Sequence, residues 1–159
     1  MPFYFLNVDL QITSGEPLDG LRDLFAARGD RFFELYCGPG QGDEFFASFE
    51  IYPDDDLLHE TGDSDEEPVM RSIPAAEKMS AFCGELEALP EGARRLFDRA
   101  RNRIFDVGYE SDDHCKALVD TFPCDLLARM AALKIDLVFT VYPQTLANDA
   151  GEAFPRQQP

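Results

Sequence analysis

The chain has 159 residues and a formal net charge of −17, because 31 Asp and Glu are balanced by only 14 Lys and Arg. Such a charge repels nucleic-acid phosphates and anionic membranes, so we expect neither as a partner, and it attracts basic proteins and cations. The 14 Phe and 5 Tyr exclude the class of acidic, aromatic-poor chains that stay disordered, and the length is that of one ordinary domain.

The amino-terminal residues lack the basic and apolar regions of a secretory signal, and no apolar run is long enough to span a membrane. We therefore expect a cytoplasmic protein. The cysteines are widely spaced and form no Cys-x-x-Cys pair, which favours reduced, partly buried thiols over a disulfide or a metal role. They are Cys37, Cys83, Cys115 and Cys124.

The first segment alternates between apolar and polar residues, as a half-buried strand does. Its apolar face holds Tyr4, Leu6, Val8, Leu10 and Ile12, and its polar face holds Asn7, Asp9 and Gln11. A turn at residues 14–17 then leads into a helix that Gly29 is placed to end. The inward side of this helix holds Leu18, Leu21, Leu24 and Phe25.

Residues 31–37 and 44–52 predict two further strands, joined as a hairpin by the glycine-rich residues 38–43. This connection lacks the Gly-Lys-Ser/Thr ending and the following helix of a phosphate-binding loop, so we interpret it as a turn. In the second strand, Phe46 and Tyr52 lie opposite a face that includes Phe45 and Phe49. Aromatic side chains on both faces indicate a strand that is covered twice or exposed to a partner.

Residues 53–74 show little periodicity and are dense in Asp, Glu, Gly and Pro, which predicts a long solvated loop. The ordered pattern of an EF-hand is absent, so a specific Ca²⁺ site is disfavoured. Clustered carboxylates would instead steer a basic protein partner toward this surface. The residues expected to do so are Asp54, Asp55, Asp56, Asp63, Asp65 and Glu66.

The apolar spacing that follows predicts two helices, around residues 79–89 and 93–100, which are separated at Pro90 and paired as a helical hairpin. The only basic cluster of the chain lies here. It consists of Arg94, Arg95, Arg99, Arg101 and Arg103. We expect these arginines to pair with carboxylates such as Glu87, Glu91 and Asp98 rather than with nucleic acid, which the net charge repels.

Residues 103–110 return to a strand pattern, with Phe105, Val107 and Tyr109 on one face. A polar turn at 111–114 follows, and residues 115–122 fit either a short strand or a helical turn, of which we favour the strand. In this region Asp112, Asp113, His114 and Cys115 adjoin one another. Neighbouring side chains on a strand point to opposite faces, so a Cys–His catalytic dyad is disfavoured.

A last helix opens at Pro123 and runs directly into a strand at residues 135–142, after which residues 144–159 form a polar tail. The inward residues of this helix are Leu126, Leu127, Met130 and Leu133. Residues 24–36 repeat the helix, turn and strand pattern of residues 130–142, which suggests two similar halves. The whole pattern predicts an α+β fold with one domain over residues 1–143, in which a mostly antiparallel sheet of five or six strands carries helices on one face.

Residues 123–142 read Pro-Cys-Asp-Leu-Leu-Ala-Arg-Met-Ala-Ala-Leu-Lys-Ile-Asp-Leu-Val-Phe-Thr-Val-Tyr. This run resembles the close of a bacterial family of short α+β domains of unknown function, and the opening strand and leucine-rich helix of residues 1–28 are similar to that family as well. Members of such families are sometimes found beside toxin genes and are suspected immunity proteins. The resemblance implies an acidic binding protein rather than an enzyme, and it supplies no catalytic residues.

We therefore expect an acidic protein-binding module, immunity-like or inhibitor-like, that recognises a basic partner and needs no cofactor or metal. Phe46 and Tyr52 are the expected apolar anchors beside the acidic loop, since aromatic side chains carry much of the energy of interfaces. Two alternatives stay open. One is a small enzyme with a site of carboxylates or His114, and the other is a domain that buries its aromatic strand in a homodimer.

Overall fold

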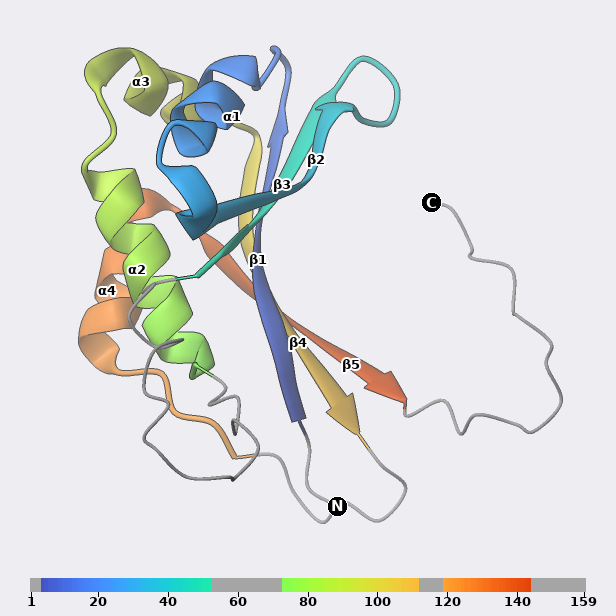
Figure 1. Cartoon of the computed structure of the whole chain (residues 1–159), viewed down its shortest axis with the longest axis vertical. Coiled ribbons are helices and arrows are strands. Elements are labelled where there is room, and N and C mark those ends of the chain that lie inside the picture. The colour runs from blue at the N-terminus through green and yellow to red at the C-terminus, as the bar shows by residue number, and fades with distance from the viewer. Residues whose placement is uncertain (1–3, 53–72, 112–118, 144–159) are drawn as a thin grey trace, which may run out of the picture.

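Figure 1 shows the computed structural model, which describes residues 4–52, 73–111 and 119–143. The elements are β1 (Tyr4–Ser14), α1 (Asp19–Ala26), the short 3-10 turn η1 (Gly29–Arg31), β2 (Phe32–Pro39), β3 (Phe45–Ile51), α2 (Ala75–Glu87), α3 (Glu91–Arg99), β4 (Asn102–Ser111), α4 (Cys124–Leu133) and β5 (Asp136–Pro143). The predicted α+β class with a mostly antiparallel sheet is confirmed. Most of the acidic loop, residues 112–115 and the polar tail lie outside the described residues.

The five strands lie in the order β2-β3-β1-β4-β5. The central strand β1 is antiparallel to β3 on one side and to β4 on the other, and β3 is antiparallel to β2. β5 is parallel to β4, because α4 returns the chain to the same end of the sheet before β5 begins. All four described α-helices lie on one side of the sheet, as Figure 1 shows.

The predicted hairpin between β2 and β3 is confirmed. The Gly40 amide donates to the Glu44 carbonyl oxygen at 2.7 Å, which closes the turn. Gly42 has φ of +63°, a conformation that a residue with a side chain rarely adopts. The glycine-rich residues 38–43 therefore make a turn between two strands and do not precede a helix.

The two similar halves suggested by the sequence correspond to two β-α-β units. β2 is antiparallel to β3, and β3 is antiparallel to β1, so β2 runs parallel to β1. The chain thus passes from β1 through α1 to a parallel edge strand, and from β4 through α4 to the other parallel edge strand. In the first unit β3 is inserted between the two parallel strands, whereas β4 and β5 are neighbours.

Phenylalanine rings connect the helices to the sheet. Phe25 of α1 stacks on Phe32 with 4.4 Å between ring centroids and meets the edge of Phe49 at 4.9 Å. Phe82 of α2 lies 5.8 Å from Phe32 and 5.5 Å from Phe105. These contacts join α1, α2, β2, β3 and β4 in one core, which also contains Val8, Leu10 and Ile12 of β1.

Two devices fix the helices in place. Three helices start directly after a proline, at Pro74, Pro90 and Pro123. The chain is still extended at these positions, so the missing N–H of proline costs no helical hydrogen bond. The buried Glu85 of α2 also forms ion pairs with Arg28 and Arg31, at 2.9 and 3.1 Å between charged atoms. This double ion pair joins α2 to the connection between α1 and β2.

Several local predictions are wrong. Leu6 is exposed, because the register between β1 and β4 shifts between Phe5 and Asn7 and turns Leu6 away from the core. Leu127 is exposed, since α4 buries only the stripe of Leu126, Met130 and Leu133. Residues 119–122, the described part of the region for which we favoured a strand, have no regular secondary structure.

The predicted helical hairpin is not confirmed. α2 packs mainly against α4 and β1, whereas α3 packs mainly against α1. Arg129 of α4 makes part of the first contact, donating to both carboxylate oxygens of Glu87 at 2.8 Å and to the Ser80 hydroxyl at 2.9 Å.

Substitution of Phe82 tests the importance of the aromatic core. We expect Phe82→Ala to lower the free energy of unfolding by about 3–5 kcal/mol, because it removes a fully buried ring and leaves a cavity between α2 and the sheet. Phe33→Ala is the matched control: the Phe33 ring is 57% exposed, so we expect a change of about 1 kcal/mol or less. Urea denaturation followed by circular dichroism measures both, and equal losses would contradict the described core.

Candidate functional site

None of the described elements covers the side of the sheet opposite the helices, which we call the open face. One row of directly paired residues crosses it from edge to edge. The row consists of Phe33 of β2, Glu50 of β3, Asp9 of β1, Asp106 of β4 and Val138 of β5. Its three central positions, Glu50, Asp9 and Asp106, are carboxylates, and we call them the acidic row.

The acidic row is held in place by polar neighbours on the same face. Asn7 donates to Asp9 at 2.8 Å. Gln11 donates to Asp106 at 3.2 Å, and the Thr140 hydroxyl donates to the other oxygen of Asp106 at 2.6 Å. The carboxylates are half-buried, and like charges at directly opposite sheet positions destabilise the pairing. The three carboxylates therefore repel one another, and their hydrogen bonds hold them close together despite this repulsion.

Lys78 is the cation closest to this row among the described residues. It belongs to α2, is buried, and donates to Glu50 at 2.9 Å. β3 pairs with β1 only as far as Glu50 and Asp9, so Lys78 reaches Glu50 where the pairing of these strands ends. Its ammonium group lies 4.9 Å from the centre of the Tyr52 ring and 5.9 Å from that of Phe5, within range for cation–π attraction.

Asp9 is the most strongly perturbed carboxyl group of the row. Its pKa is raised from 3.8 to about 6, first because burial penalises the charged form and then because Glu50 and Asp106 add negative charge on both sides. The hydrogen bond from Asn7 and the charge of Lys78 act in the opposite direction and are weaker. Asp9 therefore gains or loses its proton close to neutral pH.

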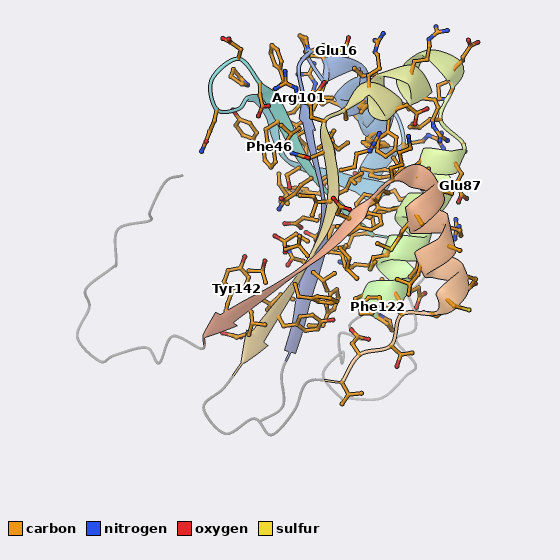
Figure 2. The ribbon with its side chains drawn as sticks, turned by 180° about the vertical axis from the view of Figure 1, so that it is seen from behind. Glu16, Phe46, Glu87, Arg101, Phe122 and Tyr142 are labelled. Carbon is orange, nitrogen blue, oxygen red and sulfur yellow. The ribbon has the colours of Figure 1, made fainter. Side chains whose placement is uncertain are left out.

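Aromatic side chains surround the acidic row. Tyr36 and Phe46 approach one another near the β2–β3 turn with 6.1 Å between their ring centroids, and Tyr52 follows the end of β3. Figure 2 shows Phe46 and Tyr142 on the side of the sheet away from the helices, with Tyr142 near the end of β5. The open face thus combines charge at its centre with large, partly exposed rings around it.

Two of the residues predicted from the sequence belong to this face. Phe46 is half-buried and Tyr52 is exposed, and their role as anchors stays a prediction. The predicted steering residues lie outside the described part of the chain and stay a prediction; they are Asp54, Asp55, Asp56, Asp63, Asp65 and Glu66.

Sequence reasoning missed the acidic row. Asp9, Glu50 and Asp106 each occupy a polar position of an alternating strand, so the face on which each lies could be predicted from the alternation. Their alignment depends on the register between three strands far apart in the sequence, which the alternation does not give.

The arginine cluster pairs within the molecule, as predicted, although the expected partner Glu87 binds Arg129 instead. Arg94 and Arg95 bind Asp98 and Glu91 at 3.0 and 2.6 Å. Arg99 binds Glu16 at 2.8 Å, Arg101 binds Glu44, and the buried Arg103 donates to the carbonyl oxygens of Phe97, Asp98 and Lys134. Figure 2 shows Glu16 and Arg101 at the same end of the molecule. Each guanidinium group therefore has a partner that competes with an external phosphate.

Two of the three described cysteines are at least partly buried, as predicted, and the third, Cys124, is exposed. Cys37, Cys83 and Cys124 are free thiols. Burial raises the pKa of Cys83 to about 11 and also raises that of Cys37, which keeps both groups in the unreactive thiol form. Within residues 4–52, 73–111 and 119–143, no group of three or more His, Cys, Asp or Glu side chains has the arrangement of a metal site. No helix among these residues is both long and apolar enough to cross a membrane.

Comparison with protein-family models, curated proteins and solved structures gives no match to this chain. The resemblance to the immunity-like bacterial family therefore stays a prediction.

Replacement of Asp9 tests the electrostatics of the acidic row. Because the pKa of Asp9 is higher in the folded chain than its ordinary value, the folded state binds the proton more tightly, and stability falls as pH rises from about 4 to about 6. Asp9→Asn removes this penalty. We expect it to raise the free energy of unfolding by about 1–2 kcal/mol at pH 8, less than full conversion of the shift because the side chain is only half-buried.

The gain should disappear near pH 4, where Asp9 is protonated in the folded state and about half protonated in the unfolded state. Denaturation of both proteins at a series of pH values measures it, and an NMR titration of the Asp9 carboxyl gives the pKa directly. A constant difference between the proteins at all pH values would show that the effect comes from packing and not from charge.

Proposed function

We propose that this protein is a binding protein whose open face docks a basic partner protein. The observation that carries the proposal is the acidic row: three carboxylates paired across the central strands of a sheet whose other side alone carries the described helices. A carboxylate row that weakens its own fold is explained if a cationic partner neutralises it on binding.

The charge of the whole chain supports a basic partner. At −17, the protein attracts cationic surfaces over a distance and accelerates their encounter, an effect that salt weakens. Lys78 already neutralises Glu50, whereas Asp9 and Asp106 receive their side-chain hydrogen bonds from neutral Asn7, Gln11 and Thr140. Asp9 and Asp106 are therefore the carboxylates available to an Arg or Lys of the partner.

The aromatic side chains support docking rather than long-range attraction alone. Tyr36, Phe46, Tyr52 and Tyr142 are large, partly exposed and rigid, and such residues supply much of the energy at interface centres. Tyr52 also closely precedes the acidic residues 54–56 in the sequence. The loop predicted to steer the partner therefore follows one of the expected anchors directly in the chain. The resemblance to immunity-like proteins supports an inhibitory role.

One observation favours a second candidate function, acid–base catalysis. A carboxyl group with a pKa of about 6, such as that of Asp9, can both accept and donate a proton near neutral pH. The two functions respond differently to substitution. Catalysis by Asp9 would be abolished by Asp9→Asn alone, whereas docking depends on the summed charge and on the rings.

Affinity capture from native cell lysate tests the docking function. The parent chain, used as bait at about 50 mM salt, should retain one basic protein and release it as salt rises. A face variant with Asp9→Asn, Asp106→Asn and Tyr52→Ala should bind the captured protein roughly a hundredfold more weakly, because it loses two charge contacts and an anchor.

Two control variants locate the binding surface. Asp30→Asn with Asp125→Asn removes two exposed carboxylates from η1 and α4, and should leave affinity within about threefold of the parent. A loop variant neutralises Asp54, Asp55, Asp56, Asp63, Asp65 and Glu66. Slower association with this variant supports the steering role, and equal losses in the face variant and the Asp30/Asp125 control would contradict docking at the open face.

A further inference from the structure

The outer edge of β5 lacks a strand partner within the part of the chain that the structure describes. β5 is last in the sheet order, so one side of its backbone pairs with β4 and the other side presents N–H and C=O groups that no described strand meets. Another strand can satisfy such a row of alternating donors and acceptors along its whole length. The chemistry of this edge therefore favours an extended backbone as its occupant.

The two edge strands of the sheet, β2 and β5, differ in the features that prevent a further strand from pairing with them. The outer strand β2 has a register shift between Glu34 and Tyr36 and ends in Gly38 and Pro39, which interrupt a regular edge. β5 pairs with β4 without a shift over its full length, and it contains no Lys, Arg or Pro before Pro143. Each edge strand ends in a proline, but the register shift that interrupts the edge of β2 is absent from β5.

The exposed side chains of β5 are arranged symmetrically about Thr140. Val138, Phe139, Val141 and Tyr142 are all 40–51% exposed, two on each side of Thr140. Val138 and Tyr142 share the open face with Thr140, and Phe139 and Val141 point to the helix side. An antiparallel copy of the strand centred on Thr140 would place Phe139 opposite Val141 and Val138 opposite Tyr142, so that every exposed apolar side chain meets another.

We propose that β5 pairs with β5 of a second copy of this chain, antiparallel and centred on Thr140. The sheets of the two protomers then form one continuous ten-stranded sheet. A two-fold axis perpendicular to the sheet relates the copies, so their helices lie on one side and their open faces on the other. The spacing of exposed apolar residues in β5 is the same when read in either direction, so a second β5 matches it, whereas an unrelated strand of another protein would not.

No charged side chain lies within the proposed contact, although each copy carries a net charge of −17 that opposes association at long range. Asp136 is the only charged residue of β5, and it lies outside the paired apolar segment. In the proposed register the two Asp136 residues are separated by eight positions along the strand, or about 27 Å, which exceeds two Debye lengths at physiological ionic strength. The paired segment of residues 138–142 thus contains no charged residue.

Sedimentation equilibrium of the full chain over a range of concentrations tests the proposal. The parent should form a dimer. Val141→Lys should raise the dimer dissociation constant roughly tenfold or more, because it places a lysine opposite Phe139 of the second copy. Leu35→Lys is the matched control on the other edge strand: Leu35 is 44% exposed against 49% for Val141, and its substitution should leave the constant unchanged.

Engineered cysteines test the register even if Val141→Lys fails to fold. Thr140→Cys brings the two new thiols opposite one another, so mild oxidation should yield a disulfide-linked dimer. Tyr142→Cys places them four positions apart along the strand, about 13 Å, which is too far for a disulfide. The parent chain under the same oxidant gives the background from its own cysteines.

A monomeric parent at all concentrations would overturn the proposal, as would equal weakening by Val141→Lys and Leu35→Lys. Disulfide linkage of the Tyr142→Cys variant as efficient as that of the Thr140→Cys variant would also overturn it, because the register would then be wrong. Dimerisation and capture of a basic protein are measured separately, and the substitutions at Val141 and Leu35 leave the acidic row intact. Failure of one proposal therefore does not decide the other.

Discussion

The contact between the phenylalanine rings of the helices and one side of the sheet determines the rest of the structure. Phe82 joins α2 to Phe32 and Phe105, and Phe25 joins α1 to Phe32 and Phe49. Because these rings hold all the described helices on one side of the sheet, the side chains on its other side stay outside the core. They are polar residues and the remaining aromatic rings. The open face is thus a direct result of one-sided aromatic packing.

The acidic row opposes the stability that this core provides. Its residues are hydrogen-bonded by their neighbours, yet the pKa of Asp9 is raised because three carboxylates share half-buried positions across neighbouring strands. A polar face could be built from Asn, Gln and Thr alone, and these residues already flank the row. Carboxylates that weaken the fold are expected at surfaces with a binding or catalytic task, where stability and activity conflict.

Local features of the sequence predicted most elements of this fold. Alternation located β1, β3, β4 and β5, and the three prolines before α2, α3 and α4 lie where the helices begin. The failures concern non-local geometry. The shift that exposes Leu6 arises in the pairing with β4, and Leu127 follows the spacing of apolar residues but falls outside the stripe that α4 buries. The alignment of the acidic row depends on the registers of three strands, which no single segment of the sequence contains, whereas the common face of Phe46 and Tyr52 follows from the alternation of one strand.

The central position of β1 also affects how the protein is made. Gln11 of β1 bonds to Asp106 of β4, 95 residues later in the chain. At about 5–20 residues per second, a ribosome needs roughly 5–20 s to add those residues, and until then the side of β1 that will meet β4 has no partner. The hairpin of β2 and β3 is complete long before. A nascent chain therefore passes through a stage with an exposed central strand, and faster translation shortens the time during which this strand can pair with that of a neighbouring chain.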